Sequence, residues 1–119
     1  MAFDFEKLDV YKKAINLAGK VYKMTKNFPE SERYGLQGQF GRAAVSIASN
    51  IAEGKGRYNK KDFAQFLRIA RGSAYECVPL VQISHREGYL TNSIYEELLN
   101  DCNEVAKMIN GLISSLISE

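Results

Sequence analysis

The chain has 119 residues, of which 45% are hydrophobic, 11% aromatic and 25% charged. This composition is typical of one folded domain and excludes a disordered chain. No apolar run approaches the roughly 18 residues that a membrane span needs. The acidic beginning, residues 1–6, lacks the basic start and the apolar stretch of a secretory signal. We therefore expect a cytoplasmic protein with no membrane partner.

The sequence offers few residues for metal binding or catalysis. Its two cysteines, Cys77 and Cys102, and its one histidine, His85, cannot supply a four-ligand zinc site or a disulfide scaffold. We expect both cysteines to be small buried residues in a reducing compartment. His85 lacks the Glu-x-x-His pattern of a di-iron bundle, so we expect a partly exposed histidine at a helix end. The sequence thus predicts no metal, no cofactor, no catalytic residue and no enzymatic activity.

The net charge of +2 conceals a strong asymmetry along the chain. Residues 1–71 carry a net charge of +7, whereas residues 72–119 carry −5. This pattern favours a polyanionic partner for the first half, or docking of the basic half of one copy on the acidic half of another. A solvated helix face is the more ordinary explanation for the first group of lysines, namely Lys12, Lys13, Lys20, Lys23 and Lys26.

The first two predicted helices differ in the size of their side chains. Between residues 8 and 24, apolar residues recur every three or four positions, which predicts a helix that ends before Pro29. The second predicted helix, residues 35–53, is rich in Gly, Ala and Ser. Each internal glycine lowers the stability of a helix by about 1 kcal/mol relative to Ala, so several of them indicate that another backbone approaches closely. Gly54 suits the left-handed position that ends a helix. The leading apolar stripe of the first helix is Leu8, Tyr11, Ile15, Ala18 and Tyr22, flanked by Ala14, Leu17, Val21 and Met24.

The third predicted helix begins after Asn59, a favourable N-cap. We expect it to be kinked at Pro79 but continuous to about Glu87, where Gly88 ends it.

The fourth predicted helix begins at a capping box formed by Ser93 and Glu96 and runs to the C-terminus. No segment shows the alternation of a strand. Short connections make neighbouring helices antiparallel. We therefore predict an all-α fold, an antiparallel up-down four-helix bundle, with a single domain over residues 1–119.

Polar residues form a line on each of the two middle helices. Those of the second helix share one face because they lie four, four and three positions apart. Three explanations remain open: an internal network in which Asn50 and Glu53 fix the helix end and Arg42 or Arg71 pairs with Glu76, a contact between subunits, or a ligand site. The residues concerned are Arg42, Ser46, Asn50, Glu53, Arg71, Ser73 and Glu76.

A basic cluster lies at the predicted turn between the second and third helices. Residues 42–71 carry 7 Lys or Arg and 2 Asp or Glu. Such cations bind nucleic-acid phosphates, and an aromatic ring among them stacks on a base. The predicted nucleic-acid-binding residues are Lys55, Arg57, Tyr58, Lys60 and Lys61.

The chain resembles a known family over nearly its whole length. The matching segments are residues 5–14, 28–29, 32–36, 39–54 and 63–73 together with Glu76, and the string at 42–54 is the most specific. They are similar to bacterial four-helix-bundle proteins named for reading frames inside 23S rRNA intervening sequences. A related branch, the accessory proteins of diversity-generating retroelements, works beside a reverse transcriptase and its RNA.

This resemblance implies a four-helix bundle, no enzymatic activity and a cyclic homo-oligomer, with five-membered rings among relatives. The sequence departs from the family pattern at Gln37, where relatives often have Thr, and at Gly41, where a larger polar or basic residue is common.

These observations support two hypotheses about function. The first is a non-enzymatic oligomeric scaffold that associates with RNA or a ribonucleoprotein through its basic surface. The alternative is a structural or protein-interaction module with no nucleic-acid partner, in which the basic half docks on the acidic half of the next copy.

Overall fold

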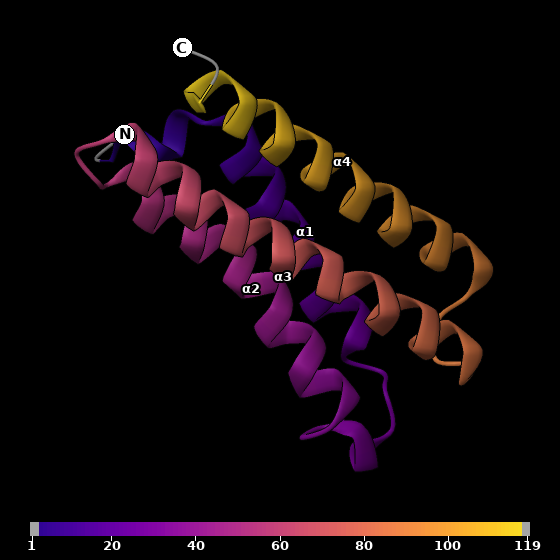
Figure 1. The fold of residues 1–119 in the computed structure, drawn as a ribbon. Helices are drawn as coiled ribbons and strands as arrows, with labels where there is room; N and C mark the ends of the chain where they lie inside the picture. The colour runs from indigo at the N-terminus through magenta and orange to yellow at the C-terminus, as the bar shows by residue number, and fades with distance from the viewer. Residues whose placement is uncertain (1–2, 118–119) are drawn as a thin grey trace.

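Four α-helices make up most of the computed structural model, which describes residues 3–117 (Figure 1). The helices are α1 (Asp9–Thr25), α2 (Leu36–Lys55), α3 (Lys60–Arg86) and α4 (Asn92–Ile117), with short 3-10 turns η1 (Asp4–Lys7) and η2 (Glu30–Glu32). Each helix packs on its neighbour in sequence and α4 returns to α1, with the largest contacts between α2 and α3 and between α3 and α4. The predicted up-down four-helix bundle is confirmed. Residues 1–2 and 118–119 of the predicted domain lie outside the described residues.

The bundle measures 46 × 25 × 22 Å, and its two ends are built differently. At one end lie the chain's beginning, the turn between α2 and α3, and the last turns of α4 (Figure 1). We call this the turn end, after residues 55–61. The opposite end carries the connection between α1 and α2, residues 26–35, and we call it the α1–α2 end. None of the described helices is both long and apolar enough to span a membrane.

The buried face of α1 is shifted by one residue from the predicted leading stripe. Ala14, Leu17 and Val21 are fully buried, whereas Ile15 is 46% and Tyr22 is 57% exposed. The predicted leading stripe was therefore wrong about which residues lie at the centre of the buried face. The apolar surface of α1 is wider than the contact that α2 and α4 make with it, and periodicity alone does not locate the centre of a wide stripe.

Gly54 serves a different purpose from the one predicted. It lies inside α2, and among the described residues only Gly88, with φ of 82°, has the left-handed backbone that ends a helix. A Cβ on Gly54 would lie 2.7 Å from Cβ of Phe66 and 3.0 Å from Cδ1 of Phe63. Gly54 is therefore a place where α3 lies directly against α2, and the close approach that the small residues predicted occurs here.

The ends of α3 and α4 show one confirmed and one wrong prediction. Asn59 caps α3, because its side chain accepts a hydrogen bond of 2.8 Å from the backbone N–H of Asp62, and α3 is continuous through Pro79. The capping box at Ser93 was wrong, since α4 begins at Asn92 and the hydroxyl of Thr91 accepts the N–H of Ile94 at 3.2 Å. A threonine two positions upstream is also a favoured cap residue.

The contact at Gly54 predicts opposite effects for two glycine-to-alanine substitutions. Gly54→Ala should lower the free energy of unfolding by about 1–3 kcal/mol, because the new methyl group forces α3 away from α2. Gly72→Ala is the matched control in α3, where a Cβ meets no atom within 4 Å. It should raise stability by about 0.4–1 kcal/mol. Urea unfolding measures both, and a Gly54→Ala variant as stable as the parent would contradict the close contact.

Candidate functional site

Three of the predicted polar residues join α2 to α3. The hydroxyls of Ser46 and Ser73 lie 2.8 Å apart. The side-chain amide of Asn50 donates to the backbone carbonyl of Ser46 at 2.8 Å and to its hydroxyl at 3.0 Å. All three residues are half-buried. This part of the predicted line is therefore an internal network, and its short side chains allow the two helices to lie close together.

The other four predicted residues do not join this network. Glu53 pairs with Arg57 at 2.9 Å, and Arg71 donates to the side-chain carbonyl of Asn110 in α4 at 2.8 Å. The pair between Arg71 and Glu76, one of the alternatives left open, is thus wrong. Glu53 and its partner Arg57 lie at the end of α2, where that alternative placed Glu53. Positions 71 and 76 are five apart and face different sides of α3.

Arg42 and Glu76 lie on the surface of the hairpin that α2 and α3 form. Within residues 3–117, neither side chain makes a hydrogen bond or an ion pair, so the predicted pair between them is also wrong. Both are available to molecules outside the chain.

The predicted nucleic-acid-binding residues gather at the turn end. Lys55 ends α2, Lys60 and Lys61 begin α3, and Tyr58 between them is fully exposed. The guanidinium of Arg57 lies 4.7 Å from the centre of the Phe66 ring and is fixed by its ion pair with Glu53. The α2–α3 hairpin therefore holds the cluster and keeps one of its cations in a defined position.

A hollow of about 290 Å³ lies beside this cluster. Four of the five predicted residues line it, and Lys61 follows in the first turn of α3. The apolar part of its lining was missed at the sequence level, because it comes from three separate segments. These apolar residues are Leu8, Phe63, Leu112 and Leu116.

The sequence profile of the 23S rRNA-intervening sequence protein family matches residues 6–111. The chain belongs to this family. It is similar to a crystal structure of a protein of unknown function from the S23 ribosomal protein family of Bacteroides thetaiotaomicron VPI-5482, with 26% sequence identity and a TM-score of 0.81. That similarity covers 88% of this chain and 95% of the other. Among curated proteins none matches the chain significantly.

This member of the 23S rRNA-intervening sequence family carries an apolar groove between α1 and α2. Ile15 and Val45, 46% and 43% exposed, lie in a hollow of about 230 Å³. Apart from Ser49, the groove is lined by apolar side chains, namely Phe5, Tyr11, Ile15, Ala18, Val45, Ala48 and Ala52. Such a surface is typical of a contact with another protein chain.

The basic and acidic halves of the chain meet inside one copy. Asp101 of α4, only 9% exposed, accepts from Lys13 at 3.3 Å and from Lys20 at 2.7 Å. Glu104 and Glu97 complete the cluster at 3.3 Å from Lys13 and 2.8 Å from Lys20, respectively. The prediction of a solvated face was therefore wrong for Lys13 and Lys20, which connect α1 to α4.

These contacts raise the pKa of both lysines above the ordinary value of 10.5. Partial burial by itself lowers the pKa of Lys13, but the hydrogen bonds and charges of Asp101 and Glu104 outweigh that effect. For Lys20, the hydrogen bonds to Asp101 and Glu97 are the leading cause of the raised pKa.

The cysteines and the histidine lie as predicted. Cys77 and Cys102 are buried and free, and their mutual hydrogen bond, together with burial, raises the pKa of Cys77. His85, near the end of α3, is half-buried, stacks on Tyr95 and lies 2.6 Å from the side-chain oxygen of Asn92. Within the described part of the chain, no three His, Cys, Asp or Glu side chains gather where they could hold a metal ion.

The ion pairs of Asp101 predict that the substitution Asp101→Asn destabilises the fold. This change should lower the free energy of unfolding by about 1–2 kcal/mol, because two lysines lose a shielded charged acceptor. Glu104→Gln is the matched control, since Glu104 is 59% exposed, and it should cost less than about 0.5 kcal/mol.

The same comparison has a defined pH dependence. A raised lysine pKa stabilises the fold fully below the unfolded pKa of 10.5, and this stabilisation disappears as the pH rises through the folded value. Urea unfolding between about pH 8 and 11.5 should therefore show the difference between parent and Asp101→Asn constant at first and shrinking at the alkaline end. A difference that is absent at about pH 8 or unchanged across the series would contradict the stabilising role of these ion pairs.

Proposed function

We propose that the protein is a non-enzymatic oligomeric scaffold of the cytoplasm that holds RNA, alone or in a ribonucleoprotein, at its turn end. The observation that carries this proposal is the fully exposed ring of Tyr58 among Lys55, Arg57, Lys60 and Lys61. An exposed aromatic side chain surrounded by cations suits an unpaired base and its flanking phosphates.

The charges at the turn end support a phosphate-binding role. Glu53, the nearest acid in α2, is paired with Arg57, and Asp62 is engaged with the cap residue Asn59. The acids nearest to the cluster in sequence, Glu53 and Asp62, thus already have partners. Contacts to phosphates would be weakly sequence-specific and strongly dependent on salt.

Repetition of the chain would make this modest surface effective. We propose a cyclic homo-oligomer, with five copies as the family resemblance implies. The exposed apolar side chains of the α1–α2 groove, Ile15 and Val45, support such an assembly. Several copies of the turn end on one assembly would bind a single RNA multivalently.

Charge reversal at the turn end tests the RNA proposal. Lys55→Glu/Lys61→Glu should weaken binding of a fluorescent single-stranded RNA and reduce the salt slope of log K by about 1.4, at about 0.7 per lost phosphate contact. The matched control is Lys23→Glu/Lys107→Glu, which makes the same change in net charge at two exposed lysines of α1 and α4. Fluorescence anisotropy across a salt series measures both.

Tyr58→Ala adds a test that does not change the charge. It should weaken binding by about 1–3 kcal/mol if a base stacks on the ring. Equal RNA affinity in the parent and the Lys55→Glu/Lys61→Glu variant at every salt concentration would reject the proposal.

The apolar α1–α2 groove favours a second candidate function, a protein-interaction module without RNA. Electrostatic docking between copies has weaker support than the sequence suggested, because Asp101 already pairs with Lys13 and Lys20 in the same chain. Light scattering and the absorbance spectrum of the purified protein separate the two functions. Assembly at high salt with no nucleic-acid absorbance and no RNA affinity would favour this second function.

A further inference from the structure

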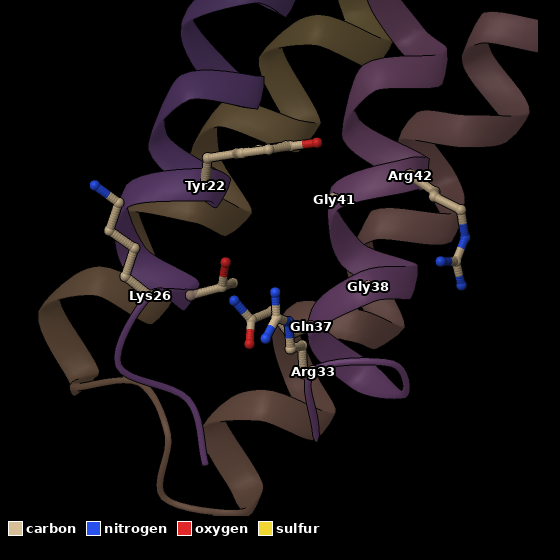
Figure 2. A pocket seen from close by; sticks show the side chains of 8 residues that line it. Tyr22, Lys26, Arg33, Gln37, Gly38, Gly41 and Arg42 are labelled. Atoms are coloured by element: carbon tan, nitrogen blue, oxygen red, sulfur yellow. The ribbon is translucent and has the colours of Figure 1, made fainter. Parts of the chain in front are cut away.

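A second cationic hollow lies at the α1–α2 end, across the length of the bundle from the basic turn. Its volume is about 380 Å³, within the lower range of small-molecule sites. The lining comes from the end of α1, the connection and the first turns of α2 (Figure 2). These residues are Tyr22, Thr25, Lys26, Arg33, Gln37, Gly38, Gly41 and Arg42.

The lining carries three cations and no acid. Within residues 3–117, the side chains of Lys26, Arg33 and Arg42 make no hydrogen bond or ion pair, and the guanidinium of Arg33 lies only over the exposed ring of Tyr34, at 5.6 Å. The neighbouring acid Glu32 is engaged elsewhere, because its carboxylate accepts the N–H of Leu36 and the hydroxyl of Tyr89, both at 3.3 Å. Positive charge in this hollow is therefore uncompensated.

Two glycines and one tyrosine shape the hollow. A Cβ on Gly38 would lie 2.9 Å from the backbone carbonyl oxygen of Arg33, and a Cβ on Gly41 would touch the Tyr22 ring at 3.4 Å. Figure 2 shows Tyr22 reaching across towards Gly41, with the polar ends of Arg33 and Gln37 directed into the space between α1 and α2. A larger residue at position 41 would displace the ring and fill the hollow.

The two remaining cations stand at the rim. In Figure 2 the side chains of Lys26 and Arg42 are directed away from the centre of the hollow. Long side chains at a surface change rotamer within nanoseconds, so these two can turn towards a bound anion.

Backbone groups add to the positive potential. Gly35 gives α2 no side-chain cap. The N–H groups of Gln37 and Gly38 in its first turn have no acceptor within the described residues. Free N–H groups at the start of a long helix favour an anion, and here they coincide with the side-chain cations.

We propose that this hollow binds a phosphate monoester carried by a nucleotide-sized molecule. The guanidinium of Arg33 would bind two phosphate oxygens at once. The amide of Gln37 and the hydroxyl of Tyr22 are further donors, and the exposed ring of Tyr22 would cover the attached organic group. The hollow shares no residue with the turn end, so the site is independent of the proposed RNA surface.

Titration of the intact protein with uridine 5′-monophosphate tests the site. Followed by ¹H–¹⁵N NMR, it should produce saturable shifts at the amides of Gly38 and Gly41, whereas uridine, which lacks the phosphate, should produce none. Arg33→Gln should raise the dissociation constant about tenfold or more, because a bidentate charged contact is lost.

Gly41→Leu should have a similar effect without changing any charge, because it fills the hollow. The matched control is Lys12→Gln, which removes one exposed lysine of α1 outside the hollow and should leave the dissociation constant unchanged. Thermal unfolding checks each variant. Arg33 is exposed, so Arg33→Gln keeps the test decisive even if Gly41→Leu does not fold.

A further pair of probes identifies the source of the phosphate. A short RNA with a 5′-phosphate and the same RNA with a 5′-hydroxyl are titrated in parallel. If the 5′-phosphorylated RNA shifts Gly38 and Gly41 and the 5′-hydroxyl RNA does not, the site also accepts RNA ends. If the mononucleotide shifts them and neither RNA does, the site accepts only a free ligand. The proposal is overturned if no phosphate monoester gives saturable shifts there, if both RNAs act equally and the mononucleotide does not, or if Arg33→Gln binds as tightly as the parent.

Discussion

The close approach of α2 and α3 is the contact on which the rest of the structure depends. At Gly54 the absence of a side chain lets the backbone of α2 lie against Phe63 and Phe66, and further along the helices the hydroxyls of Ser46 and Ser73 meet at 2.8 Å. Larger side chains at these positions would separate the helices. The hairpin then presents the basic turn at one end, and the start of α2 forms part of the cationic hollow at the other.

Electrostatics inside the chain decide which positive charges remain for partners. Asp101 accepts from Lys13 and Lys20, so α4 neutralises these two lysines in the middle of α1. The cations of the basic turn and of the hollow lie near the two ends of a bundle that is 46 Å long. This separation would allow two anionic ligands to bind independently. A scaffold that meets RNA at one end and a phosphorylated molecule at the other requires such a separation.

The sequence predicted the features that depend on neighbours along the chain. The four helices, the cap at Asn59 and the basic cluster around Tyr58 follow from spacing and residue type, and they are where the sequence placed them. The central face of α1 could not be predicted, because Ile15 and Ala14 are both apolar and only the positions of the neighbouring helices decide which of them is buried.

Features that join distant segments also escaped prediction. The partner of Lys20 lies 81 positions away in sequence, and the cationic hollow combines α1, a connection and α2. Neither leaves a pattern within a single window of sequence. The small residues of α2 did predict a close approach, but the specific role of Gly54 depends on where Phe66 packs.

Native-state hydrogen exchange tests the central contact most directly. If the α2–α3 contact holds the bundle together, the amides of Ile47 and Ile51 in α2 and of Leu67 and Ala70 in α3, all fully buried, exchange only when the whole chain unfolds. Their exchange free energies should therefore equal the global free energy of unfolding. If these amides exchange with a lower free energy than the amides of the buried residues of α1, the central role of this contact is contradicted.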